Sequence, residues 1–206
     1  MKIIGITGPS GSGKSILGNF LANRDIPVIN ADELYHSLLI PPSRCLDKIR
    51  DSFGDEVFNS DGTLNRPALS HVVFADKSKL ELLNSSVLSI VIEEAEKLID
   101  EFARSGKKIV AMDAPTLIES GFDRKCDLVI SVISDPSTRA KRISERDNIS
   151  DSDAAERIGA QQNDDFYKKH SDVVIINDED LASFLKQAEK IYSEVTAESD
   201  DTEATR

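Results

Sequence analysis

The residues with the clearest chemistry lie near the start of the chain, where small residues and a lysine follow a short apolar run. The segment GPSGSGKS, residues 8–15, matches the pattern G-x-x-x-x-G-K-[ST]. Glycines in such a loop let backbone N–H groups converge on phosphate oxygens, while the lysine reaches the β- and γ-phosphates and the serine holds Mg²⁺. The residues that we expect to bind a nucleoside triphosphate and its metal ion are Gly8, Gly11, Ser12, Gly13, Lys14, Ser15 and Ile16.

Two aspartates follow apolar runs that we predict to be strands. Asp32 comes after IPVIN (26–30), and Asp113 ends KKIVAMD (107–113). Open α/β sheets bind ligands at the carboxyl ends of their strands. At that edge Asp32 would reach the γ-phosphate, and Asp113 would hold Mg²⁺ through water. The alternatives are structural, with Asp32 as a helix N-cap and Asp113 as a cap or turn residue.

A basic cluster occurs later, in RAKRISER (139–146). Spacings of three and four place Arg139, Arg142 and Arg146 on one face of a helix. Arginines on a mobile lid can close on a phosphoryl group and stabilise its transition state. The alternative is a solvated helix face whose arginines pair with neighbouring carboxylates.

These side chains need a scaffold to position them, and the hydrophobic pattern predicts one. Continuous apolar runs, typical of buried parallel strands, occur at residues 2–7, 26–30, 107–113, 126–133 and 172–176. Helical patterns occur at residues 14–23, 31–39, 44–53, 66–74, 76–104, 136–147, 151–164 and 178–195. Strands that alternate with helices predict an α/β fold with a doubly wound, five-stranded parallel sheet.

The lengths of the connections predict how the chain is organised within one domain, residues 1–195. The connection between the second and third strands is longer than one crossover helix needs, so we expect a helical lobe there. The expected parts are a core (residues 1–32, 107–134 and 171–195), a helical insert (about 33–106), a lid (about 135–170) and a disordered acidic tail (196–206).

Composition excludes several classes of partner. The 206 residues carry a formal net charge of -12, which disfavours binding to nucleic acid or to an anionic membrane. No apolar run approaches the length of a membrane span. Cys45 and Cys126 are interpreted as free thiols in a reducing cytosol. We therefore expect a cytoplasmic protein with small-molecule partners, either a monomer or at most a weak homo-oligomer.

Taken together, the motifs resemble those of the dephospho-coenzyme A kinase family over about residues 2–190. The matching segments, in order, are IIGITGPSGSGKS (3–15), NADELYH (30–36), GTLNRPALSHVVF (62–74), DAPTLIESG (113–121), RISERDNISDSDAAERIGAQ (142–161) and SDVVIIN (171–177). The departures from the family pattern are Ser86-Val87 for His-Pro, Arg139 for glutamine, Thr116 for leucine and Asp178 for glycine.

This resemblance implies a P-loop kinase fold with a helical acceptor lobe and a lid. It also implies ATP-dependent phosphorylation of the ribose 3′-hydroxyl of dephospho-CoA, which is the last step of CoA synthesis, with ATP and Mg²⁺ bound. Asp32 would orient or deprotonate the hydroxyl, and Lys14 and Arg142 would hold the phosphates. The remaining residues implied are Arg139 and Asn177 on the ATP side, with Asn177 near the base, and Arg66, Leu117 and Glu119 on the acceptor side.

Two other functions remain open at this point. A P-loop kinase that phosphorylates another nucleoside or nucleotide would share every phosphate-binding residue. A protein that binds ATP without transferring phosphate would share the loop, because function resides in sites rather than in folds.

Overall fold

The computed structural model of the protein describes residues 1–204, apart from the side chains of residues 74, 77, 80, 84 and 198–204. The chain divides into two compact units. One comprises residues 1–29 together with the chain from residue 102 onward, and the other comprises residues 30–101. The second unit overlaps the insert that we expected at about 33–106.

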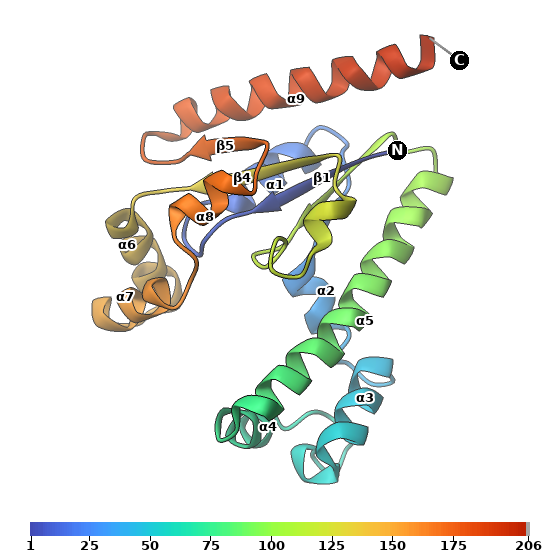
Figure 1. The fold of residues 1–206 in the computed structure, drawn as a ribbon, viewed down its shortest axis with the longest axis vertical. Coiled ribbons are helices and arrows are strands. Elements are labelled where there is room, and N and C mark those ends of the chain that lie inside the picture. The colour runs from blue at the N-terminus through green and yellow to red at the C-terminus, as the bar shows by residue number, and fades with distance from the viewer. Residues whose placement is uncertain (205–206) are drawn as a thin grey trace. The chain divides into compact units, whose positions relative to one another are not determined.

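The sheet has five parallel strands in the order β2-β3-β1-β4-β5. The strands are β1 (Lys2–Thr7), β2 (Val28–Asn30), β3 (Ile109–Asp113), β4 (Leu128–Ile133) and β5 (Val173–Ile176). β1 lies at the centre and pairs with β3 and β4 (Figure 1). The loops that follow these strands therefore meet at one edge of the sheet. The predicted doubly wound parallel sheet is confirmed.

The helices of the first unit are α1 (Lys14–Ala22), α6 (Pro136–Asp147), α7 (Asp151–Gly159), α8 (Asp164–Lys169) and α9 (Leu181–Ala204), with a 3-10 turn, η2 (Phe122–Lys125). Helices α1 and α9 pack together on one face of the sheet (Figure 1). Phe20 and Tyr192 make an edge-to-face contact between them, with ring centroids 6.2 Å apart. The segment after β3 covers the opposite face, where Gly5 lets Leu117 approach β1 closely.

One predicted helix, 151–164, is in fact two helices. α7 ends at Gly159, and α8 begins at Asp164. Asn163 separates them, because its side-chain oxygen accepts a hydrogen bond from the backbone N–H of Phe166 at 2.9 Å and caps α8. The short connection places Gln161 outside both helices, which becomes important at the candidate site.

The last helix also differs from the expectation. We predicted a helix over 178–195 and disorder from residue 196, whereas α9 runs from Leu181 to Ala204. The segment SEVTAESDDTEA contains no glycine or proline to end the helix, and alanine and glutamate favour its continuation. Residues 205 and 206 of the expected tail lie outside the described residues.

The second unit is helical and has its own core. Its elements are α2 (Ala31–Ser37), α3 (Arg44–Phe53), a 3-10 turn η1 (Asp55–Val57), α4 (Arg66–Phe74) and α5 (Lys77–Arg104), which continues past residue 101. Ile49, Phe53 and Leu69 belong to one buried cluster that also includes Val87. Helix α5 runs without a break through Ser86-Val87, because no proline removes a backbone donor there.

Candidate active site

The glycine-rich loop joins β1 to α1, and its shape requires glycine. Gly8, Gly11 and Gly13 have φ values of 137°, 76° and 101°, in a region that other residues rarely adopt. A Cβ on Gly8 would lie 2.1 Å from the Val132 carbonyl oxygen. A Cβ on Gly13 would lie 2.3 Å from Nδ2 of Asn177. The loop is therefore fixed by close contact with β4 and with the residue that follows β5.

The Gly8→Ala variant is expected to be less stable by about 2–4 kcal/mol, from steric overlap and left-handed strain together. ATP binding should weaken about tenfold, because the loop amides would have to move. Thermal melting and calorimetry measure the two effects. Gly106→Ala is the matched control, since Gly106 also has a positive φ of 85° but has nothing within 4 Å of its Cβ position. Equal melting temperatures for the two variants would contradict the steric argument.

Lys14 and the serines around it carry the polar groups of the loop. The Lys14 ammonium donates to the carbonyl oxygens of Gly8 and Pro9, at 2.8 and 3.1 Å. Ser15 is exposed at the start of α1. Ser12 is fully buried, and its hydroxyl has no hydrogen-bond partner among the described residues. A buried, unpaired hydroxyl inside a loop of this kind fits an anionic ligand.

Arg142 of α6 connects the loop to the ends of two strands. Its guanidinium donates to the Gly11 carbonyl at 3.2 Å, the Ser134 hydroxyl at 3.3 Å and the Asn177 carbonyl at 3.1 Å. Asn177 in turn donates from Nδ2 to the Ser12 carbonyl at 2.7 Å. These bonds join the phosphate loop, the end of β4 and the end of β5 into one hydrogen-bonded edge.

The three arginines of α6 do not share one environment, although their spacing predicted a common face. Arg139 is only 3% exposed, donates to the Ser134 carbonyl at 2.9 Å and pairs with Asp164 at 3.5 Å. Arg146 makes a bidentate pair with Asp147, at 2.7 and 3.0 Å. Arg139 is thus held inside the first unit, and Arg146 has the carboxylate partner that the alternative interpretation predicted.

Asp113 ends β3 beside the central strand and is 7% exposed. Its Oδ2 lies against α1, 3.8 Å from the position of a Cβ on Gly18. Ser15 precedes Gly18 by three residues and therefore lies on the same side of the helix. A hydroxyl and a carboxylate are the oxygen donors that Mg²⁺ prefers. The described part of the chain contains no group of three or more His, Cys, Asp or Glu side chains that could hold a metal ion.

In the second unit, Asn30 rather than Asp32 caps helix α2. The Asn30 side-chain oxygen accepts from the backbone N–H groups of Asp32 and Glu33, at 2.9 and 3.1 Å. The N-cap alternative for Asp32 is therefore wrong. Its carboxylate is exposed and has no hydrogen bond or ion pair within the described residues. Arg66 lies nearby in the same unit, with its guanidinium 3.3 Å from Nδ1 of His36 on α2.

Leu117 and Glu119 have different surroundings. Leu117 is fully buried, and its Cδ2 would lie 2.5 Å from a Cβ on Gly5, so its side chain belongs to the core. Glu119 is exposed. Burial, followed by the negative charge of Glu119, raises the pKa of Tyr167 to about 12. Of these two residues, only Glu119 has a side chain open to a ligand.

Three residues at this edge were not predicted as site residues. The Ser134 hydroxyl lies within hydrogen-bond distance of two acceptors, the Asn177 carbonyl oxygen at 3.0 Å and the Asp178 carboxylate at 2.8 Å. Gln161 accepts from the Ser10 backbone N–H at 3.0 Å. The position of Ser134 directly after a strand was a usable signal. Asp178 and Gln161 had none beyond their places in the family motifs.

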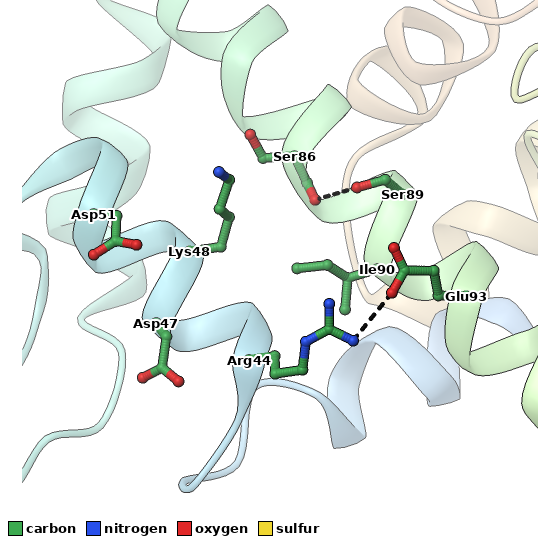
Figure 2. Close-up of a pocket in the computed structure, with 8 residues that line it drawn as sticks. All are labelled: Arg44, Asp47, Lys48, Asp51, Ser86, Ser89, Ile90 and Glu93. Carbon is green, nitrogen blue, oxygen red and sulfur yellow. Dashed lines mark hydrogen bonds and ion pairs between the residues drawn. The ribbon is translucent and has the colours of Figure 1, made fainter.

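A separate pocket of about 320 Å³ lies between α3 and α5 in the second unit (Figure 2). Its lining residues are Arg44, Asp47, Lys48, Asp51, Ser86, Ser89, Ile90 and Glu93. Arg44 already pairs with Glu93 at 3.0 Å. Three carboxylates against two cations do not favour a polyphosphate ligand, and we assign the pocket no role.

A glycine-rich loop at the first turn of a parallel sheet, followed by a helix, defines a P-loop protein. No helix in the part of the chain that the structure describes is long and apolar enough to cross a membrane. The dephospho-CoA kinase family model matches residues 2–183. The chain therefore belongs to the dephospho-CoA kinase family.

Curated relatives carry the same family name, and solved structures share the fold. The chain is 36% identical to the dephospho-CoA kinase of Listeria monocytogenes, over 90% of this chain and 93% of that one. It is 32% identical to the Corynebacterium glutamicum enzyme, over 95% and 98% of the two chains. A Thermus thermophilus protein superposes with a TM-score of 0.77 at 26% identity, covering 94% of this chain and 97% of that one. Dephospho-CoA kinase from Campylobacter jejuni shares the fold, with a TM-score of 0.70 at 23% identity and 95% and 98% coverage.

Proposed function

We propose that this protein transfers the γ-phosphoryl group of ATP to the ribose 3′-hydroxyl of dephospho-CoA, giving CoA. The observation that carries the proposal is the glycine-locked loop with Lys14, in a chain that belongs to the dephospho-CoA kinase family over residues 2–183. Phosphoryl transfer depends mainly on positioning and charge neutralisation, and these are what the site residues can provide.

The triphosphate would lie in the glycine-rich loop, with its oxygens on the backbone N–H groups at the start of α1. The Lys14 ammonium would exchange the carbonyls of Gly8 and Pro9 for the β- and γ-phosphates. The buried Ser12 hydroxyl would gain a partner. The loop residues assigned to ATP are Gly8, Gly11, Ser12, Gly13, Lys14, Ser15 and Ile16.

Mg²⁺ would be held by the Ser15 hydroxyl directly and by Asp113 through water, with phosphate oxygens completing its coordination. When bound, Mg²⁺ neutralises charge on the β- and γ-phosphates. The base of ATP would lie near Asn177, at the carboxyl end of β5. Arg142 would hold the end of β5 next to the loop through its hydrogen bonds to Gly11 and Asn177. The buried Arg139 would support the same edge through its hydrogen bond to Ser134.

The acceptor would be handled by residues 30–101, with Asp32 orienting its hydroxyl or taking the proton as the new P–O bond forms. Arg66 and Glu119 would contact the acceptor, and the segment 135–170 would close as a lid that excludes water. Leu117 would support this region through the core only. No step requires Asp32 to stabilise α2, because Asn30 caps that helix.

A ³¹P NMR experiment with ATP, Mg²⁺ and a panel of acceptors tests the function. We expect ADP and a new phosphomonoester signal with dephospho-CoA, and neither signal with adenosine, AMP or shikimate. A new phosphomonoester with another acceptor would identify a different P-loop kinase. ATP binding without transfer to any acceptor would show that the protein binds ATP but is not a kinase.

We also propose that the protein works as a monomer in the cytoplasm, on small molecules only. The net charge of -12 supports the lack of nucleic-acid and anionic-membrane partners. Cys45 and Cys126 are both free. Burial, followed by nearby aspartates, raises the pKa of Cys126 to about 12, so its thiol stays protonated at neutral pH. Analytical ultracentrifugation measures the oligomeric state.

Arg142→Lys is expected to lower the transfer rate about tenfold, because one ammonium cannot reproduce the planar fork that reaches three acceptors. ATP affinity should fall less than turnover, since part of the contact would form only on closure. Steady-state kinetics and calorimetry compare this variant with Arg142→Ala. Lys141→Ala is the control, because Lys141 is the exposed neighbour on α6. If Arg142→Ala turned over like the parent, Arg142 would have no part in transfer.

A further inference from the structure

Gln161 forms a side-chain hydrogen bond to a backbone N–H of the glycine-rich loop. Its Oε1 accepts from the Ser10 N–H at 3.0 Å, across 151 residues of sequence. Ser10 lies within the Gly8–Lys14 loop, and Gln161 lies in the short connection between α7 and α8. The contact therefore ties the segment 135–170 to the part of the chain that would hold the triphosphate.

Gln161 reaches the loop from a well-supported position. Its own backbone N–H donates to the Ile158 carbonyl at 3.1 Å, which closes the last turn after α7. Arg157 of α7 pairs with Asp147 at the end of α6, at 2.6 Å. Helix α6 itself lies on the loop, because a Cβ on Gly11 would be 2.9 Å from the Arg139 carbonyl oxygen. The loop is thus contacted both by α6 and by the residue that follows α7.

The carboxamide of Gln161 is used at one end only. Its oxygen is held by Ser10, whereas its Nε2 donates to no group in the described part of the chain. The two ends of a carboxamide are joined through one carbon atom, so Nε2 also lies beside the loop. Nε2 can therefore donate to a ligand bound in the loop, where the phosphate oxygens of a nucleotide are the expected acceptors.

We propose that Gln161 is a two-ended clamp, with Oε1 fixed by the Ser10 N–H and Nε2 donating to the terminal phosphate of ATP. The clamp distinguishes ATP from ADP, because only ATP carries the third phosphate. The same contact would hold the segment 135–170 against the loop while ATP is bound. The inference rests on the proposed ATP site, but it does not depend on the identity of the acceptor.

Two substitutions separate the two ends of the carboxamide. Gln161→Glu keeps an oxygen for the Ser10 N–H, removes the Nε2 donor and adds a negative charge. Gln161→Leu removes both hydrogen bonds without adding charge. The matched control is Gln162→Glu, which adds the same charge at the exposed neighbouring residue. Calorimetry with a non-hydrolysable ATP analogue and with ADP gives the affinities, and thermal melting checks the fold of each variant.

For Gln161→Glu we expect the affinity for the ATP analogue to fall about tenfold or more, and the affinity for ADP to stay within about twofold. Gln161→Leu should weaken binding of the ATP analogue about fivefold, again with little change for ADP. Gln162→Glu should bind both nucleotides like the parent. In the absence of acceptor, Gln161→Leu should hydrolyse a larger share of its ATP, because a loosened clamp admits water.

Three results would overturn the proposal. If Gln161→Leu binds the analogue as well as the parent does, the carboxamide makes no contact with the terminal phosphate. If the affinity for ADP falls as much as the affinity for the ATP analogue, Gln161 only stabilises the conformation of the loop. If either nucleotide binds Gln161→Leu more tightly, the side chain blocks the loop instead of clamping the ligand. A parent protein that binds ATP but does not phosphorylate dephospho-CoA would refute the proposed function and leave this binding test intact.

Discussion

Replacing Lys14 with alanine is expected to lower the rate of phosphoryl transfer by about two orders of magnitude or more, a typical cost for one preorganised charge contact. The ammonium already lies over the loop, held by the carbonyls of Gly8 and Pro9 at 2.8 and 3.1 Å. A short rotation of a flexible stem would bring it to the β- and γ-phosphates. Without it, the charge that develops on the transferring group would lose a stabilising protein cation.

The measurement is the initial rate of ADP formation with saturating dephospho-CoA, together with thermal melting. Lys14→Met should be nearly as inactive as Lys14→Ala, because it keeps the apolar stem and removes only the charge. Lys186→Ala is the control for a general loss of positive charge, since Lys186 lies on the exposed side of α9. Unchanged turnover in Lys14→Ala would overturn the assignment of the phosphate loop.

The Asp32→Asn variant is expected to transfer phosphate about a hundredfold more slowly, at the lower end of the range for a general base. Asparagine has nearly the same shape, but it cannot accept the hydroxyl proton. A loose phosphoryl-transfer transition state needs little early deprotonation, which favours the smaller effect. ATP should bind at least as well as in the parent, because the variant removes a negative charge that the proposed function places near the γ-phosphate.

Asp32 does not cap helix α2, so its replacement should affect catalysis without affecting that helix. Asn30, and not Asp32, accepts the hydrogen bonds at the start of α2, at 2.9 and 3.1 Å. Stability should therefore change by only about a few tenths of a kcal/mol, from the lost interaction with the helix dipole. Glu33→Gln is the matched control, because it removes the same charge from the same exposed turn. Normal transfer by Asp32→Asn would show that Asp32 is not the catalytic carboxylate.

The parts of the molecule that sequence could predict are those set by local pattern. Five apolar runs became the five strands of a parallel sheet, because period and β-branched composition are properties of each segment alone. The glycines of the phosphate loop were also readable, since a positive φ at Gly8, Gly11 and Gly13 follows from the motif.

Local pattern could not predict which of several polar side chains takes a shared role. Asn30 and Asp32 are both good caps by type, and only the backbone geometry selects Asn30. The spacing of Arg139, Arg142 and Arg146 gives one helix face, but tertiary contacts bury the first and pair the last with its neighbour. These outcomes depend on what packs against each residue.

Long-range contacts were the least predictable part of the candidate site. Gln161 meets Ser10 across 151 residues, and no periodicity in either segment indicates the other. Leu117 lies in a motif that implies acceptor binding, yet the absence of a side chain on Gly5 lets it pack against the central strand. Such pairings are fixed by the topology of the sheet and not by either segment alone.

The capping of α2 by Asn30 has a consequence for how variants would behave in cells. Cellular quality control degrades unfolded protein, so the steady-state abundance of a variant depends on its folding stability. Abundance does not depend on whether the variant is catalytically active. Substitutions of Asp32 should leave abundance near that of the parent, whereas Asn30→Ala, which removes two hydrogen bonds, should lower it. A survey of variants scored by protein level would therefore rank Asp32 as dispensable, and only a growth assay that depends on the product would show its importance.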